Sequence, residues 1–120
     1  MMTVNELKAA LTQFTGSEEF YYHPLFRKFH YTEGVRFVAQ EAEAYWLLEK
    51  ILSNQILPEL RNEHFQSWKL TVESDKSALL VCEDGNYVKI YSEKIDYTDF
   101  PLEEISFFFT NSVLLLPSEY

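Results

Sequence analysis

The spacing of apolar residues changes along this chain from a helical period to an alternating one, and that change limits the fold more than any other feature. In "TVNELKAALTQF" (residues 3–14), apolar residues recur at helical spacing behind a capping box formed by Thr3 and Glu6. In "SWKLTVE" (residues 67–73), apolar and polar residues alternate, which is typical of a strand with one buried face. Helices followed by strands predict an α+β domain.

A second and longer helix is expected in "VRFVAQEAEAYWLLEKILSNQ", which follows Gly34 and ends before Pro58. Its apolar residues occupy most of the helix circumference, so we expect it to pack on the sheet and on the first helix together. These two main N-terminal helices should cover one face of the sheet. The predicted core residues are Trp46, Leu48, Trp68, Leu70, Leu80, Ile90 and Phe108.

The strands should form an antiparallel meander of about five strands from residues 65–117, in the C-terminal half. The run "ISFFFT" contains consecutive phenylalanines at 107–109, which must divide between the two faces of the sheet. An outward phenylalanine that the segment 20–33 does not cover would mark a contact between two copies of the chain. A homodimer is therefore one expected assembly.

Composition and charge limit the class of protein. The 120 residues are enough for one domain, 1–120, and 47% of them are hydrophobic, so the chain can fold without a disulfide or a structural metal. A net charge of −9 repels phosphate backbones, so a nucleic-acid partner is not expected. The start "MMTVNELKAAL" lacks a signal-peptide pattern, and no apolar run reaches the roughly 18 residues of a membrane span. We expect a cytoplasmic protein with no membrane partner.

One segment concentrates the groups that could bind a ligand. "FYYHPLFRKFHYTEG" (residues 20–34) contains six aromatic residues, two histidines and the only adjacent basic pair of the chain. We expect an irregular connection that packs its aromatic rings over the sheet. The candidate binding rim on it consists of Tyr22, His23, Arg27, His30 and Glu33. A small enzyme with a hydrolytic or transfer site at this rim is the first alternative function.

No catalytic, cofactor-binding or metal-binding residue is predicted. His23, His30 and His64 match no metal-ligand spacing, and Cys82 is typical of a small apolar strand residue without a disulfide partner. The chain contains no Gly-x-Ser-x-Gly motif and no glycine-rich phosphate loop. No cofactor is therefore expected.

Two short motifs, "YTEG" (residues 31–34) and "YTDF" (residues 97–100), share a Tyr-Thr-acid pattern. Because Thr and Asp are good helix N-caps, each motif is expected to begin a helical turn. The alternative is a paired binding site made from both.

The acidic excess, together with the lack of catalytic motifs, favours a non-catalytic protein that binds a protein partner. The second alternative is imitation of DNA to inhibit a host DNA-binding protein, which requires carboxylates along one face. The acids that could form this face are Glu73, Asp75, Glu83, Asp84, Glu93, Asp96 and Asp99. The lysines that lie among the same strands and would interrupt the field are Lys69, Lys76, Lys89 and Lys94.

Four stretches of the chain, "LTQFTGSEEFYYHP", "YTEGVRFVAQEAEAYWLL", "YTDFPL" and "LLLPSEY", resemble a family of small bacterial single-domain proteins known only as a domain of unknown function. The resemblance extends over nearly the whole chain. It implies a stand-alone bacterial protein, carried on mobile elements, and it brings no assigned activity and no catalytic residue.

Overall fold

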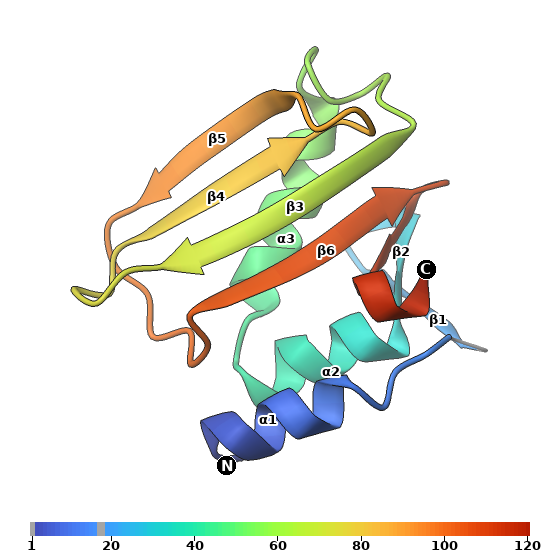
Figure 1. Cartoon of the computed structure of the whole chain (residues 1–120). Coiled ribbons are helices and arrows are strands. Elements are labelled where there is room, and N and C mark those ends of the chain that lie inside the picture. The colour runs from blue at the N-terminus through green and yellow to red at the C-terminus, as the bar shows by residue number, and fades with distance from the viewer. Residues whose placement is uncertain (1, 17–18) are drawn as a thin grey trace.

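The computed structural model describes residues 2–16 and 19–120, and it combines three helices with a seven-stranded sheet (Figure 1). The helices are α1 (Val4–Leu11), α2 (Glu33–Glu41) and α3 (Tyr45–Ser53), with the 3-10 turns η1 (Asn54–Ile56) and η2 (Pro117–Glu119). The α+β class is therefore confirmed. Among the described residues, no helix is both long enough and apolar enough to cross a membrane.

The sheet differs from the predicted five-stranded antiparallel meander. Its strands are β1 (Phe20–His23), β2 (Phe26–Thr32), β3 (Phe65–Val72), β4 (Ala78–Glu83), β5 (Lys89–Ile95), β6 (Glu104–Thr110) and β7 (Val113–Leu115). They lie in the order β1-β2-β7-β6-β3-β4-β5, in which β2 and β7 run parallel and all other neighbours antiparallel. The meander is broken because β6 pairs with β3 and not with β5. This order leaves β5 at one edge of the sheet and β1 at the other.

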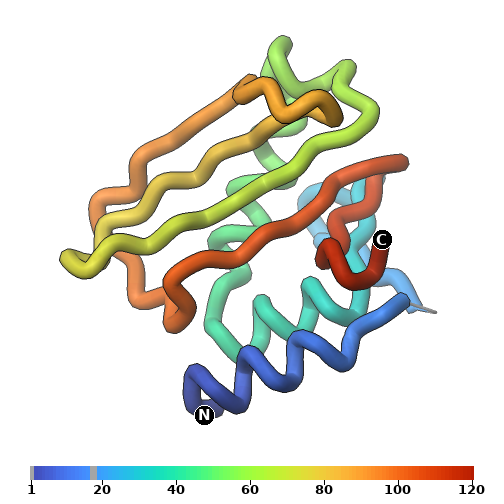
Figure 2. The backbone as a smooth tube through the Cα atoms, in the orientation of Figure 1, coloured from blue at the N-terminus to red at the C-terminus, as the bar shows by residue number. Residues whose placement is uncertain are grey.

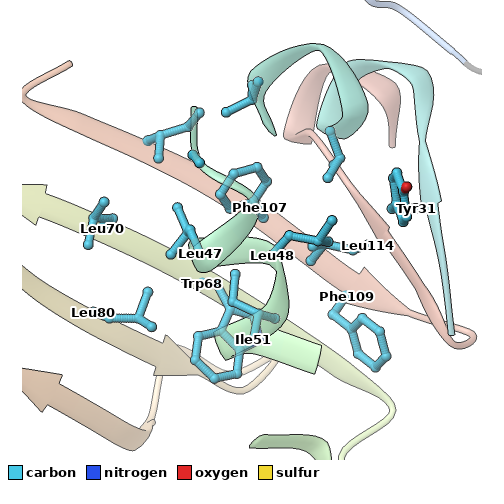
Figure 3. Close-up of a cluster of buried hydrophobic side chains, with 14 of the residues drawn as sticks. Tyr31, Leu47, Leu48, Ile51, Trp68, Leu70, Leu80, Phe107, Phe109 and Leu114 are labelled. Atoms are coloured by element: carbon cyan, nitrogen blue, oxygen red, sulfur yellow. The ribbon is translucent and has the colours of Figure 1, made fainter. Parts of the chain in front are cut away.

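The core lies between the helices and the inner face of the sheet (Figure 3). Alternation along β3 places Trp68 and Leu70 on this face, and both are fully buried. Gln66 shares the face, and its side-chain oxygen accepts a hydrogen bond from the Trp68 indole at 2.8 Å. Of the predicted core residues, four are buried (Leu48, Trp68, Leu70 and Leu80) and two are half-buried against the core (Trp46 and Ile90).

The prediction that Phe108 belongs to the core is wrong. In the β3–β6 register Phe107 lies opposite Trp68, so Phe107 faces the helices and Phe108 faces outward. The Phe108 ring contacts Phe65 at 5.0 Å and Tyr120 at 5.4 Å between centroids. The outward phenylalanine is thus packed against these two rings. A contact between two copies at this position stays a prediction.

The predicted long helix is in fact two helices joined by an elbow at residues 42–44. Glu43 has a positive φ of 50°, and the Ala44 amide donates to the Ala39 carbonyl at 2.9 Å. This is the hydrogen bond of a Schellman motif, which ends α2 and turns the chain into α3. Glycine usually occupies the left-handed position, so the glutamate here concealed the end of the helix.

The segment 20–32, expected as an irregular connection, is a hairpin of β1 and β2. Pro24 lies in the turn between the strands, where a missing amide hydrogen and a fixed φ do not disturb the ladder. Phe29 and Tyr31 of β2 are buried, and the Phe29 ring contacts Phe109 at 5.6 Å. Phe29 and Tyr31 therefore join the core as predicted, but from a regular strand, whereas Phe20 and Tyr22 of β1 are more than half exposed.

The C-terminal turn η2 fixes the start of α2. One Glu119 carboxylate oxygen accepts from the Thr32 hydroxyl at 2.6 Å, and the other accepts from the Gly34 amide at 3.2 Å. Thr32 in turn caps α2 by accepting from the Val35 amide at 3.3 Å. The "YTEG" motif therefore begins a helix, as predicted.

The second motif, "YTDF", does not begin a helical turn. The Thr98 hydroxyl accepts from the Phe100 amide at 3.1 Å in an irregular connection between β5 and β6. The threonine here stabilises a local turn instead, because its hydroxyl can accept a hydrogen bond from the backbone amide two residues further on.

Candidate functional site

The predicted binding rim is distributed over both faces of the β1–β2 hairpin. Tyr22 lies opposite His30, and their rings are 6.4 Å apart at nearly right angles. Tyr22 is 55% exposed, whereas the next residue, His23, is buried. Arg27 is exposed on β2. Glu33 is half-buried at the start of α2.

His23 has hydrogen bonds at both ring nitrogens. Its Nδ1 lies 3.0 Å from the Leu25 amide, which can only donate, so Nδ1 is the unprotonated nitrogen of the neutral ring. Its Nε2 therefore carries the hydrogen and donates to the Glu49 carboxylate at 2.9 Å. Both nitrogens are used in holding the hairpin turn against α3, which leaves neither for proton transfer to a substrate.

The structure brings Tyr22 and His30 together but does not gather the five rim residues into one cavity. None of the five lines the groove or the smaller hollow described below. Their role as a binding rim stays a prediction.

The described part of the chain offers little support for a nucleophilic cysteine or for a metal site. Cys82 is fully buried in β4, and burial raises the pKa of its thiol to about 12, so it is not a thiolate at neutral pH. Within residues 2–16 and 19–120, no three His, Cys, Asp or Glu side chains are grouped so that they could hold a metal ion.

A groove of about 730 Å³ lies at the other end of the sheet, and the sequence did not point to it. It is formed by four segments: the N-terminal residues Met2 and Leu7, the α2–α3 elbow with α3, the end of β5, and residues 97–101 of the β5–β6 connection. Figure 2 shows the elbow and this connection at the same end of the molecule. The volume is in the range of ligand-binding pockets, about 300–1,000 Å³.

The apolar wall of the groove contains Trp46, which is half-buried, together with Ile95 and Phe100. At the rim, Glu41 and Glu43 are exposed at the elbow. No ion pair joins either glutamate to a cation of the described residues. The lining contains four acidic residues against two lysines. A positively charged ligand therefore fits the groove better than a negatively charged one.

A hydrogen-bonded set crosses the end of the groove between α3 and β5. The Lys50 ammonium donates to one Glu93 oxygen at 2.5 Å, and the Tyr91 hydroxyl donates to the other at 2.7 Å. The hydrogen bond from Lys50 holds the pKa of Glu93 below its usual value, and burial with the Glu93 bond raises the pKa of Tyr91 to about 12. At neutral pH Glu93 is ionised and Tyr91 is protonated, so neither is suited to exchange a proton near pH 7.

A smaller hollow of about 430 Å³ continues the groove toward the hairpin. It shares Trp46, Lys50 and Glu93 with the groove, and it reaches Leu25 in the hairpin turn and Phe26 at the start of β2. Leu25 is 78% exposed. The two hollows together form a continuous surface along α3.

The acids that were candidates for DNA imitation do not form one face. Four lie at one end of the sheet (Glu73, Asp75, Asp96, Asp99), two lie at the opposite end, where β4 ends and the chain turns into β5 (Glu83, Asp84), and Glu93 faces α3. Lys69 pairs with Glu104 at 3.3 Å, and Lys76 pairs with Asp99 at 3.4 Å. The scattered acids and the paired lysines do not provide the acidic face that DNA imitation requires.

One sequence signal that could have located this site is the presence of the polar residues Tyr91 and Glu93 in the strand β5. Tyr91 and Glu93 lie opposite Cys82 and Leu80, so they point toward the helices. A register shift between Cys82 and Glu83 adds a residue to β5 and thereby places Tyr91 inside. Strict alternation from the predicted core residue Ile90 would place Tyr91 on the outer face, and the register shift reverses this assignment.

A family model matches residues 5–120. The chain belongs to the family of unknown function DUF6876. No curated protein matches the chain, and no solved structure matches it either. The match includes all four stretches on which the resemblance rested, and it includes every groove segment apart from Met2. The family assigns no activity to the groove or to the hairpin.

Proposed function

We propose that this protein is a non-catalytic cytoplasmic protein of bacteria that binds a protein partner through the groove beside β5. One observation carries the proposal: a large open groove combines an aromatic wall with an acidic rim, next to a strand that has no second neighbour. Aromatic side chains surrounded by charged groups are typical of protein-binding surfaces.

The enzyme alternative has less support. It would place a site at the hairpin, where His23 uses both ring nitrogens in internal hydrogen bonds. In the groove, the Lys50–Glu93–Tyr91 set satisfies its own hydrogen bonds and does not resemble a nucleophile with an adjacent base.

Affinity capture from the native bacterium, with the full-length chain as bait, tests the proposal. We compare the unchanged protein with Glu43→Lys, which reverses one charge on the groove rim. Glu59→Lys is the matched control, because Glu59 is also exposed and does not line the groove. We expect a stoichiometric partner that Glu43→Lys reduces at least tenfold and Glu59→Lys retains.

Two results would contradict this function. A partner retained by Glu43→Lys but lost by Tyr22→Ala would assign binding to the hairpin. Turnover of a substrate that is abolished by His23→Ala, at unchanged stability, would favour the enzyme.

A further inference from the structure

We infer that the groove binds an extended, lysine- or arginine-bearing segment of the partner, which adds to the sheet as a new strand beside β5. The inference rests on the proposed function and specifies how the partner binds. It follows from the open edge of the sheet, from the position of the groove along that edge, and from the charge of the lining.

The edge of the sheet formed by β5 is open. β5 pairs only with β4, so every second backbone amide and carbonyl along it points away from the sheet. The opposite edge is less suited to pairing, because β1 has only four residues and its register shifts between Tyr22 and His23. β5 has seven residues, and its register shift lies near its start, at the Cys82–Glu83 step. Its second half is regular.

The groove lies against the end of β5. Three consecutive residues of β5, Glu93, Lys94 and Ile95, all line it. Consecutive side chains of a strand point to opposite faces, so a hollow that touches all three reaches the edge of the strand. An extended segment in the groove can therefore lie beside the open edge of β5. Main-chain hydrogen bonds would supply its affinity, as in other cases of strand addition.

The acidic lining of the groove favours an occupant with positive charge. Side chains of an added strand alternate, so every second one faces the helices, where Trp46, Glu41 and Glu43 lie. A cationic side chain at these positions is attracted both by the carboxylates and by the face of the indole ring. A second copy of this chain is a poorer occupant, because each copy has a net charge of −9.

The test uses the full-length ¹⁵N-labelled protein and a seven-residue peptide of alternating lysine and valine, blocked at both ends. Two further peptides carry N-methyl groups on the valine amides or on the lysine amides, and a fourth replaces lysine by glutamate. An added strand directs only one of the two amide sets toward β5. We expect one N-methylated peptide to bind at least tenfold more weakly and the other to change by less than threefold. The glutamate peptide should bind at least tenfold more weakly than the lysine peptide.

The amide signals of residues 91–95 should shift on binding and become protected from hydrogen exchange, while those of the β1–β2 hairpin stay unchanged. Equal effects of the two N-methyl patterns, or no binding of the lysine peptide, would overturn strand addition. Concentration-dependent dimerisation in sedimentation that protects residues 91–95 would instead identify a second copy as the occupant. Each of these outcomes leaves the capture experiment intact, since partner loss in Glu43→Lys does not depend on main-chain pairing.

Discussion

The two ends of the sheet differ in which residues they use and in what they leave open. The β1 end, which consists of the β1–β2 hairpin, β7 and η2, contains most of the histidine and aromatic residues that stand out in the sequence. These side chains contact one another: the Tyr21 ring stacks on Tyr31 at 5.9 Å, and the Arg36 guanidinium lies 4.5 Å from the Tyr21 ring. The β5 end, which consists of β5, the elbow and the β5–β6 connection, has an open groove. Unusual composition therefore marks the end where aromatic rings pack on one another, and strand order determines which end has the open groove.

Gly34→Ala should cause the largest loss of stability, because it acts on the contact that closes the β1 end. A Cβ at Gly34 would lie 2.6 Å from both the Glu119 carboxylate and the Leu116 side chain. Glu119 would have to move away from its hydrogen bonds to Thr32 and Gly34. We expect the free energy of unfolding in urea to fall by about 2 kcal/mol, even though alanine favours helix.

Gly16→Ala is the matched control, because a Cβ there meets nothing within 4 Å. Its stability should stay unchanged or rise by up to about 1 kcal/mol. In a Glu119→Ala background Gly34→Ala should cost less, since the displaced carboxylate is already absent and only the close contact with Leu116 remains. Equal effects of both glycine substitutions would show that η2 contributes little to the β1 end.

His23→Ala should lower the free energy of unfolding by about 2 kcal/mol, because it removes two part-buried hydrogen bonds and leaves the Leu25 amide without its acceptor. His23→Asn should recover part of the loss, since an asparagine side chain can accept from the amide two residues later. His30→Ala, at a half-buried site on the same hairpin, is the comparison and should cost less than about 1 kcal/mol. An unaffected His23→Ala protein would mean that this imidazole is not structural and would return it to the candidate site residues.

At the β5 end, Glu93→Gln should cost about 1 kcal/mol at pH 7, because it removes the charged partner of Lys50. The pKa of Glu93 in the folded state is lowered, chiefly by the hydrogen bond from Lys50, below its usual 4.5. Its contribution is therefore present above pH 4.5 and is lost as the pH falls through the folded pKa. The stability difference between the two proteins should shrink toward zero in acid, as measured by urea unfolding from pH 7 down to pH 3. A difference that is constant over this range would contradict an ionic role.

Glu43→Gly should raise stability by about 0.5–1 kcal/mol, because glycine adopts the positive φ at this position without steric cost. Ser112→Gly is the matched change at the β1 end, where Ser112 has a φ of 61° in the β6–β7 turn, and a similar gain is expected. The two should differ in partner capture: Glu43→Gly should weaken it by removing a rim carboxylate, and Ser112→Gly should leave it unchanged. If both variants captured the partner equally well, the elbow would not be part of the binding surface.

The class of the fold could be predicted from the sequence because periodicity is a local property. The strand patterns at Trp68, Leu70 and Leu80 were sufficient to identify buried positions. The elbow was missed because Glu43 occupies a backbone conformation that usually belongs to glycine. The prediction for Phe108 is wrong because alternation alone does not determine which of the three consecutive phenylalanines face the helices; the register with β3 determines it.

The candidate site could not be predicted in the same way, because it depends on pairings between distant residues. β6 returns to β3 instead of pairing with β5, and only this choice leaves the edge of β5 open. The groove joins Met2, the elbow and residues 97–101, which share no local pattern. The sequence identifies His23 only as a titratable residue, and the acceptor role of its Nδ1 is apparent only from the turn geometry.

The parallel pairing of β2 with β7 has a consequence for the order in which the chain acquires structure during synthesis. His30 pairs with Val113, and the Thr32 hydroxyl bonds the carboxylate of Glu119, so the early hairpin has no neighbouring strand beside β2 until β7 has left the ribosome. Strands β3, β4 and β5 can pair meanwhile, since their turns are short. A nascent chain from which β5 has left the ribosome and β6 has not should therefore hold paired β3, β4 and β5 and a hairpin that contacts α2 and α3 but lacks its neighbouring strand β7, and this is the stage at which a chaperone that recognises exposed apolar residues would bind.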